Sequence, residues 1–585
     1  MPPSDRSAIF GRAVALHKEG RLDEAAAAYR AIAQQYPRDF DAQHLLGILQ
    51  LQRGDAITAL SSFERAVAID PRSARAQHNR GRAFEALNRS GEALAAYDAA
   101  LAIEPASAEI LNDRGVALRQ QKRLAEALAT FERALAIRPD FLPALGNRAL
   151  VLMRLHRPAA ALDGFDRLIA LAPDHVEGLV NRARLLQSFG DGDAAIAAYR
   201  RVLALKPGLV AAEGALADAL AAAGREDEAM ALARSILARP IRAPAMSDND
   251  RDRFLALRTL ALLPEPPADL DLAASLSAMR PPDGMTVSMF ETMWHFALAA
   301  LRHKEGAHEA AWHHLEAAHR PLRETARAQR DARRQSYAAA WATVDAVPDL
   351  DDAIPQRADL PVSLFILGPS RSGKTMLERL IATMPGVHEG GENALARIAR
   401  ERVIDSGGDS GGDSGDGSDG PDLTRLSPDQ RARFADEYAR LLARAGDARI
   451  VTGTAPGNIR DMVALAGLVP NLRLVFLKRA RADLILRIAM KQYSGNDYAG
   501  DPASIAAYLD FYDGMTDRLA ARFPRHALLL HYEDVVDDPK AARAAIAQLC
   551  GVEAPDAPVP ALPDDRNCAL PYAALIAAAL SAGQT

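Results

Sequence analysis

The sequence predicts a chain of two main parts, in which an all-α solenoid of repeated helix pairs precedes an α/β domain with a parallel sheet. Two observations lead to this prediction. Prolines recur every 34 residues through much of the first 240 positions. Further on, an apolar run of strand length at Ser363–Leu367 leads into a glycine-bounded loop and then a helical pattern. The expected divisions are a repeat array at 7–240, a helical bridge and cap at 241–360, and an α/β domain at 361–585 with a disordered acidic insert at 407–420.

The composition excludes several classes of protein. Hydrophobic residues make up 49% of the 585 positions and charged residues 25%, as in ordinary folded proteins. A formal charge of −6 argues against a nucleic-acid partner. The two cysteines, Cys550 and Cys568, supply neither a disulfide framework nor a metal cluster. Because MPPSDRSAIF lacks an apolar signal core and no apolar run is of spanning length, we expect a cytoplasmic protein with no membrane span.

The repeat is defined by prolines and by small residues at fixed distances before them. The prolines are Pro37, Pro71, Pro105, Pro139, Pro173 and Pro207, followed after 33 residues by Pro240. Twenty-four residues before the first six lie Ala13, Gly47, Gly81, Gly115, Ala149 and Ala183. Twelve residues before them lie Ala25, Ala59, Ala93, Ala127, Ala161 and Ala195. The pattern predicts pairs of helices that touch at the small residues, with the proline ending the second helix.

This pattern resembles the tetratricopeptide repeat, in about seven copies. The resemblance implies a right-handed superhelix whose concave face holds a protein or peptide. Four polar residues, each 26 positions before a repeat proline, would form a ladder on that face: Asn79, Asp113, Asn147 and Asn181. Their side chains could grip an extended peptide backbone, since amides both donate and accept hydrogen bonds. The alternative is that they are solvated polar residues of an inner helix.

The bridge shows helical patterns but no 34-residue period. The expected helices are 254–263, 270–279, 290–301 and 307–322. The acidic segment 349–359, which contains Pro355, is expected to be a hinge before the next domain.

In the α/β domain, short apolar runs alternate with helical patterns. The expected strands are 364–367, 450–451, 472–477 and 527–530. The expected helices are 376–384, 394–404, 429–445, 459–468, 482–492, 504–523 and 540–550. Strands separated by helices favour a parallel sheet covered on both faces, with ligands at the carboxyl ends of the strands.

The loop after the first of these strands fits the phosphate-loop pattern G-x-x-x-x-G-K-[ST]. Its fixed positions are Gly368, Gly373, Lys374 and Thr375. Backbone N–H groups of such a loop converge on one point, and the following helix adds partial positive charge. Arg371, Ser372, Lys374 and Thr375 supply further donors. The loop therefore predicts binding of a polyanion, without indicating which one.

Three stretches carry a second resemblance. ILGPSRSGKTMLERLIATMPGVHEGGE, LRLVFLKRARADLILRIAMKQY and LLLHYEDVVDDP resemble, in this order, segments of sulfotransferases. More narrowly, the chain resembles bacterial sulfotransferases fused behind tetratricopeptide repeats, which are related to the protein-tyrosine sulfotransferases. The resemblance implies transfer of a sulfuryl group from 3′-phosphoadenosine 5′-phosphosulfate to a hydroxyl of a protein, such as a tyrosine, or of a glycan, with no metal.

The resemblance also implies roles for particular residues. The phosphate loop, Arg371 to Thr375, would hold the 5′-phosphosulfate, and Arg479 and Arg487 the 3′-phosphate. Glu392 would be the general base, with Lys374 as a catalytic cation. The alternatives are that Glu392 caps a helix at 394 and that Arg479 is an ordinary salt-bridge arginine.

The chain departs from the family pattern at several places. Gly453-Thr454 stands where the family has Asp-Lys, so that Lys374 would take the place of the missing cation. Arg487 stands where the family has a serine, and the tail after Asp565 is so short that the family's last cofactor loop is expected to be absent or degraded. Two other functions remain open. One is a non-catalytic repeat scaffold with a degenerate nucleotide domain, and the other is an ATP-using kinase, since Lys374 completes an ATP-type loop.

Overall fold

The chain divides into two compact units, Met1–Arg182 and Ala183–Thr585, in a computed structural model. The structure describes every residue except 1–2, 156, 190, 240–246, 283–284, 391–394, 406–422, 424–425, 455–457, 493–496, 557, 560–561 and 583–585. The acidic insert expected at 407–420 therefore lies outside the described residues. Among those described, no helix is both long and apolar enough to cross a membrane.

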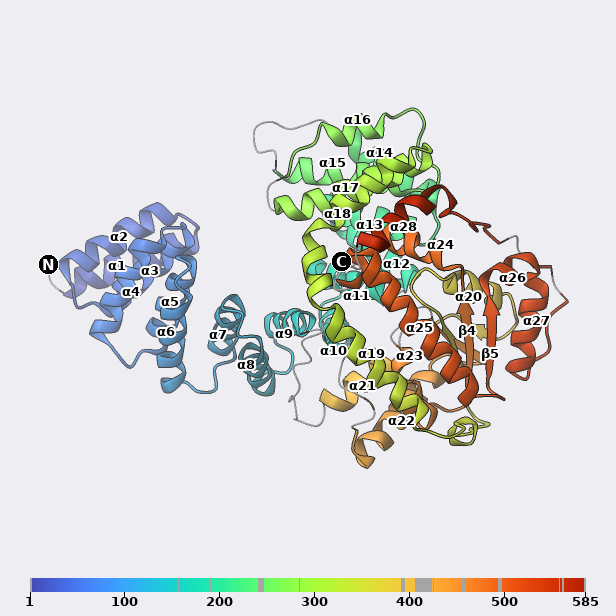
Figure 1. Cartoon of the computed structure of the whole chain (residues 1–585). Helices are drawn as coiled ribbons and strands as arrows, with labels where there is room; N and C mark the ends of the chain where they lie inside the picture. The colour runs from blue at the N-terminus through green and yellow to red at the C-terminus, as the bar shows by residue number, and fades with distance from the viewer. Residues whose placement is uncertain are drawn as a thin grey trace. The chain divides into compact units, whose positions relative to one another are not determined.

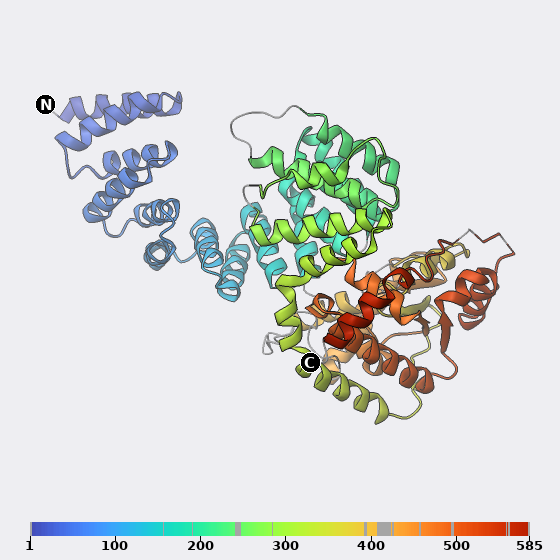
Figure 2. The same cartoon turned by 45° about the horizontal axis from the view of Figure 1, so that its top comes forward.

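The first unit consists of antiparallel helix pairs. Its helices are α1 (Pro3–Lys18), α2 (Leu22–Gln35), α3 (Phe40–Gln52), α4 (Ala56–Ile69), α5 (Ala74–Ala86), α6 (Ser90–Ile103), α7 (Ala108–Gln120), α8 (Leu124–Ile137), α9 (Leu142–Arg154) and α10 (Pro158–Leu171), and α11 (Val176–Ser188) begins in this unit. The second helix of each pair ends two residues before a repeat proline. Figure 2 shows these blue helices stacked pair upon pair, as the proline spacing predicts.

Close contacts between the two helices of a pair explain the small residues. A Cβ atom at Gly81 of α5 would lie 2.4 Å from the ring of Tyr97 on α6. The same construction at Gly47 meets Phe63 at 2.7 Å, and at Gly115 it meets Phe131 at 2.6 Å. The aromatic side chain of the second helix thus packs directly on the backbone of the first.

The second unit begins with more helices of the solenoid and continues into the bridge. They are α12 (Gly192–Leu205), α13 (Val210–Ala222), α14 (Glu226–Leu237), α15 (Ser247–Leu262), α16 (Leu272–Ser277), α17 (Val287–Lys304), α18 (His308–Ala328) and α19 (Arg330–Asp345). The segment expected to be a hinge is instead hydrogen-bonded to the α/β domain. Asp351, in the 3₁₀-helix η1 (Asp351–Ala353), is buried and accepts hydrogen bonds from the backbone N–H of Arg525 at 2.8 Å and from His526 Nδ1 at 2.6 Å. The prediction of a hinge was wrong because it considered only local composition.

The α/β domain is built on a five-stranded parallel sheet with strand order β2-β3-β1-β4-β5. The strands are β1 (Val362–Leu367), β2 (Val387–His388), β3 (Ile450–Gly453), β4 (Leu472–Lys478) and β5 (Ala527–His531). In the central register, Ser363 of β1 pairs with Val451 of β3 on one side and with Leu472 of β4 on the other. Four of these strands were predicted from apolar runs, and the two-residue β2 was not.

Helices cover both faces of the sheet, as expected for a parallel arrangement. The helices of the domain are α20 (Lys374–Ala382), α21 (Leu395–Asp405), α22 (Pro428–Ala443), α23 (Asn458–Ala466), α24 (Arg481–Ala489), η3 (Asp497–Gly500), α25 (Pro502–Arg522), α26 (Tyr532–Asp537), α27 (Pro539–Leu549), η4 (Leu570–Tyr572) and α28 (Ala573–Ala582). On one face, Ile381 of α20 and Ile546 of α27 share a core with Leu364 of β1. On the other side of the sheet, α25 contacts β4 and β5, and α19 packs on α25 (Figure 1).

The bridge helices α17 and α18 share a hydrophobic core with the α/β domain. This core joins Phe296 and Leu315 of the bridge to Leu486 of α24 and Ile576 of α28. The buried His319 of α18 also forms a 2.7 Å hydrogen bond with the carbonyl oxygen of residue 489, at the end of α24. The bridge therefore supports α24, the helix that follows the predicted phosphate-binding Arg479.

Candidate functional site

The phosphate loop lies between β1 and α20, as the sequence predicts. Gly373 adopts φ +102°, a conformation that side chains other than glycine rarely take. A Cβ atom there would lie 2.6 Å from the ring of Tyr532, and one at Gly368 would lie 2.8 Å from the carbonyl oxygen of Leu477. Close contacts therefore require glycine at both positions, and at Gly373 the backbone conformation requires it as well. The loop ends at the N-terminus of α20, where the partial positive charge of a helix favours anions.

Lys374 is the first residue of α20, and its side chain contacts this loop. Its ammonium Nζ donates to the carbonyl oxygens of Gly368 at 2.8 Å and of Pro369 at 2.9 Å, and its residue is 6% exposed. Ser372 is fully buried, and no hydrogen-bond partner of its hydroxyl is found among the described residues. A buried polar atom of this kind is a donor that a bound anion can satisfy.

Helix α25 contributes two tyrosines to the loop. The backbone N–H of Gly368 donates to the Tyr512 hydroxyl at 3.2 Å, and that of Ser370 donates to the Tyr508 hydroxyl at 3.4 Å. Burial raises the pKa of Tyr512 well above its ordinary value, so this hydroxyl stays protonated. The two tyrosines are four residues apart and therefore lie on the same face of α25, beside the loop.

Arg479 follows strand β4, and its guanidinium is almost completely buried, with 1% of the side chain exposed. Its Nη2 donates to the carboxylate Oδ1 of Asp565 at 2.8 Å and to the backbone oxygen of the same residue at 2.9 Å. The guanidinium carbon also lies 4.0 Å from the ring centroid of Tyr532, a cation–π contact. Asp483, one turn further along, is 3.9 Å from the same guanidinium.

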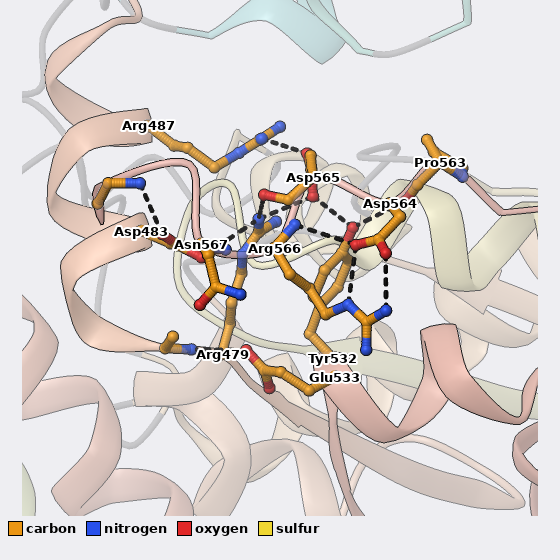
Figure 3. Close-up of polar contacts among 12 residues, drawn as sticks. Arg479, Asp483, Arg487, Tyr532, Glu533, Pro563, Asp564, Asp565, Arg566 and Asn567 are labelled. Carbon is orange, nitrogen blue, oxygen red and sulfur yellow. Dashed lines mark hydrogen bonds and ion pairs between the residues drawn. The ribbon is translucent and has the colours of Figure 1, made fainter. Parts of the chain in front are cut away.

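The carboxylate of Asp565 has two further partners. Arg487 Nη1 forms an ion pair with its second oxygen, and the Tyr532 hydroxyl donates to its first at 2.5 Å. Figure 3 shows the two guanidinium groups and the phenol converging on this one carboxylate. Burial would raise the pKa of Asp565, but the Tyr532 hydrogen bond and the charges of Arg487 and Arg479 hold it below its ordinary value. Asp565 is therefore ionised at neutral pH.

Both arginines retain unused donors. The Nε atoms of Arg479 and Arg487 are buried, and neither has a hydrogen-bond partner among the described residues. Because a guanidinium presents five N–H donors, one carboxylate does not satisfy two of these groups. The cluster of Arg479, Arg487 and Tyr532 can therefore accommodate an anion with more acceptor oxygens than a carboxylate has.

A cavity of about 890 Å³ opens beside this cluster, at the carboxyl ends of β4 and β5. It is lined by Lys478, Arg479, Ala480, Asp483, Asp513, Asp517, His531, Glu533, Asp564, Arg566 and Asn567. This is the edge of a parallel sheet at which ligands bind. In the same cavity, Glu533 accepts a 3.0 Å hydrogen bond from the backbone N–H of Ala480 and so fixes the turn after Arg479.

The structure describes some of the site residues predicted from sequence and not others. It brings Arg479 and Arg487 together on Asp565. It places Arg371, Ser372 and Gly373 in the loop after β1, and Lys374 and Thr375 in the first turn of α20. Glu392, the predicted general base, lies outside the described residues. No group of three or more His, Cys, Asp or Glu side chains that could hold a metal ion occurs in the described part of the chain.

The predicted polar ladder of the repeats contacts the repeats themselves. Asn79 Nδ2 lies 2.9 Å from His44 Nε2, and Asp113 Oδ2 lies 2.7 Å from His78 Nε2. The other two amides act as donors: Asn147 Nδ2 donates to Asn112 Oδ1 at 3.0 Å, and Asn181 Nδ2 donates to the carbonyl oxygen of Glu177 at 2.9 Å. The first three of these contacts join neighbouring repeats.

Sequence reasoning missed two parts of the site. Asp565 was noted only as the start of a degraded tail, although the pair Asp564-Asp565 close behind a predicted anion site was a signal of its own. The spacing of Tyr508 and Tyr512 also indicated one helix face, but nothing local connected that face with a loop some 140 residues earlier.

Comparison with known proteins defines the class. A model described as the sulfotransferase family matches residues 361–556. Models of the tetratricopeptide repeat match residues 1–40, 44–108, 78–140, 147–210 and 186–240. The chain therefore carries a sulfotransferase-family domain behind a tetratricopeptide-repeat solenoid, which confirms the predicted fold class and the resemblance to repeat-containing sulfotransferases.

Three of the solved structures with similarity to the chain are the following. PilF of Pseudomonas aeruginosa is 25% identical, with a TM-score of 0.32, over 34% of this chain and 92% of its own. A tetratricopeptide repeat protein from Parabacteroides merdae is 18% identical, with a TM-score of 0.36, over 43% and 99%. YrrB, described as a repeat protein with an unusual peptide-binding site, is 17% identical, with a TM-score of 0.28, over 32% and 98%. No curated protein matches the chain.

Proposed function

We propose that the protein transfers the sulfuryl group of 3′-phosphoadenosine 5′-phosphosulfate to a hydroxyl of a protein or glycan, in the bacterial cytoplasm. The observation that carries this proposal is the cluster of the buried Arg479 and the partly buried Arg487 at the carboxyl end of β4, next to a phosphate loop in a sulfotransferase-family domain. The donor carries two separated anionic groups, and the site offers two separated groups of cations and N–H donors.

The two cationic regions divide the binding of the donor. Arg371, Ser372, Gly373, Lys374 and Thr375 would hold the 5′-phosphosulfate, with the orphaned Ser372 hydroxyl and the start of α20 as donors. Arg479 and Arg487 would hold the 3′-phosphate through their unused Nε–H groups. These orphaned donors are the structural reason that a bisphosphate fits the residues present.

The proposed reaction requires little covalent chemistry from the protein. The acceptor oxygen forms a bond to sulfur, the bond from sulfur to the bridging phosphate oxygen breaks, and 3′-phosphoadenosine 5′-phosphate leaves. A general base accepts the acceptor proton, and Glu392 remains our candidate for it. Fixed cations such as Lys374 would stabilise the charge that develops on the sulfuryl and bridging oxygens.

The repeats would hold the acceptor. The polar ladder pairs across neighbouring repeats, so Asn79, Asp113 and Asn147 stiffen the inner helices even before a peptide binds. Binding to a preorganised surface costs less conformational entropy than binding to one that must order. A protein or peptide acceptor therefore remains the proposed partner of the solenoid.

Calorimetric titration with 3′-phosphoadenosine 5′-phosphate tests the proposal. We expect saturable binding to the parent protein and weaker binding to Arg479→Ala, by roughly ten- to a hundred-fold, as for loss of a charged hydrogen bond. Arg481→Ala is the matched control, because Arg481 is two residues away, exposed, and paired with Asp510. Lys374→Ala should also weaken binding.

A parallel titration with ATP and Mg²⁺ separates the alternatives. Binding of ATP without the bisphosphate would refute the sulfotransferase assignment and favour a kinase. Binding of neither compound would leave the repeats as the working part of the chain. Equal affinity in Arg479→Ala and the parent would place the bisphosphate elsewhere.

A further inference from the structure

Asp565 contacts both arginines to which the proposed function assigns the donor's 3′-phosphate. Its carboxylate contacts Arg479 Nη2, Arg487 Nη1 and the Tyr532 hydroxyl, as Figure 3 shows. Two guanidinium groups and a phenol are donors suited to a phosphate. A carboxylate brings one negative charge and two oxygens to this place, whereas a phosphate monoester brings up to two charges and three free oxygens.

The unused donors indicate that the cluster is larger than Asp565 requires. The Nε atoms of both arginines are buried without a partner among the described residues. Leaving a buried charged donor unsatisfied is unfavourable, and a single carboxylate cannot reach every N–H of two guanidinium groups. The cluster is therefore better matched to a phosphate than to the carboxylate it contacts.

The chain beyond Asp565 is attached to the domain independently of that carboxylate. Asp483 accepts hydrogen bonds from the backbone N–H groups of Asn567 and Ala569, each at 2.9 Å. Arg566 forms ion pairs with Asp564 and Asp537. The Asp565 side chain is itself 32% exposed. It can therefore swing off the arginines while these neighbouring contacts keep the segment in place.

We propose that Asp565 is an internal counter-anion that competes with the 3′-phosphate of the donor for Arg479 and Arg487. The inference rests on the proposed function, since it takes these two arginines as the 3′-phosphate ligands. Asp565 stabilises the empty protein by neutralising the buried Arg479 and the partly buried Arg487, and it lowers donor affinity by occupying both guanidinium groups. A donor binds when its 3′-phosphate displaces the carboxylate.

The test compares Asp565→Asn with the parent chain in titrations with 3′-phosphoadenosine 5′-phosphate. If the carboxylate occupies the arginines about 90% of the time, its loss should tighten binding about tenfold. Asp556→Asn is the control, because it makes the same charge change on a fully exposed side chain in the same region. Thermal unfolding without ligand should show a lower midpoint for Asp565→Asn than for the parent, since Arg479 and Arg487 lose their counter-ion.

If Asp565 competes with the donor, Asp565→Asn should lower the ligand-free thermal midpoint and raise the affinity for the bisphosphate. If Asp565 has only a structural role, the substitution should lower both the midpoint and the affinity. If the parent binds the bisphosphate and Asp565→Asn binds it no more tightly, the competition is refuted and the proposed function stands. If neither binds, the proposed function fails and the competition with it. If Asp565→Asn with Arg479→Ala binds as tightly as Asp565→Asn alone, the gain does not come from these arginines and the inference is overturned.

Discussion

Gly373→Ala should damage both the stability of the α/β domain and the proposed anion site. The added methyl group would lie 2.6 Å from the Tyr532 ring, and the backbone would have to keep φ +102°. Forcing a residue with a side chain into the left-handed region costs about 1–2 kcal/mol. Overpacking of a well-filled site adds about 1–3 kcal/mol. We therefore expect a loss of roughly 2–5 kcal/mol in the free energy of unfolding.

Chemical denaturation and thermal unfolding of the full chain, each resolved for the second unit, measure this loss in the free energy of unfolding. Gly467→Ala is the matched control, since no atom lies within 4 Å of its added Cβ and its φ is not left-handed. The control should stay within about 1 kcal/mol of the parent. The Tyr532 ring also makes the cation–π contact with the Arg479 guanidinium. Because Gly373→Ala would displace this ring, it should weaken bisphosphate binding as well. A Gly373→Ala protein with parental stability would refute this account of the loop.

Two further predictions concern the repeats and the bridge. Gly81→Ala should destabilise its repeat by about 1–3 kcal/mol, because its methyl would meet the Tyr97 ring at 2.4 Å. Gly146→Ala, with 3.7 Å to the nearest atom, should stabilise its helix by up to about 1 kcal/mol, and amide exchange within each repeat would show the opposite signs. Acidification from pH 7 to pH 5 should lower the thermal midpoint of the second unit. Burial, and after it the charges of His295 and other cations, lowers the pKa of His314 from 6.5 to about 4. Neutral His314 therefore stabilises the folded state near pH 7, and this stabilisation is lost as the pH falls below 6.5. His314→Gln should flatten that dependence, and a midpoint that rises on acidification would contradict it.

The repeats were predictable because the residues that pack against each other lie at a fixed distance along the chain. Gly81 and Tyr97 are 16 residues apart, and the same small–aromatic contact recurs at Gly47–Phe63 and Gly115–Phe131. A contact that repeats every 34 residues appears directly as a period. The two-residue β2 carries no such signal, since a strand of that length shows no alternation and is defined by its pairing with β3.

The site was predictable only where its chemistry is local. The phosphate loop lies within eight consecutive residues, Gly368 to Thr375, and was readable as a motif. Asp565 lies 86 residues after Arg479, and no period or motif joins the two positions. The hinge expected at 349–359 failed for the same reason, since Asp351 is held by Arg525 and His526, 174 and 175 residues later.

Helix α24 links the bridge, the proposed anion site and the C-terminal segment. Its apolar face packs Leu486 into the core that α17 and α18 share with α28. Its other side chains include Asp483, which holds the backbone of Asn567 and Ala569, and Arg487, which contacts Asp565. The position of Arg487 relative to Asp565 therefore depends on how the bridge helices pack against α24. A domain cut from the chain at residue 361 would expose this core. We therefore expect the sulfotransferase-family domain to need the bridge in order to hold the proposed anion site in place.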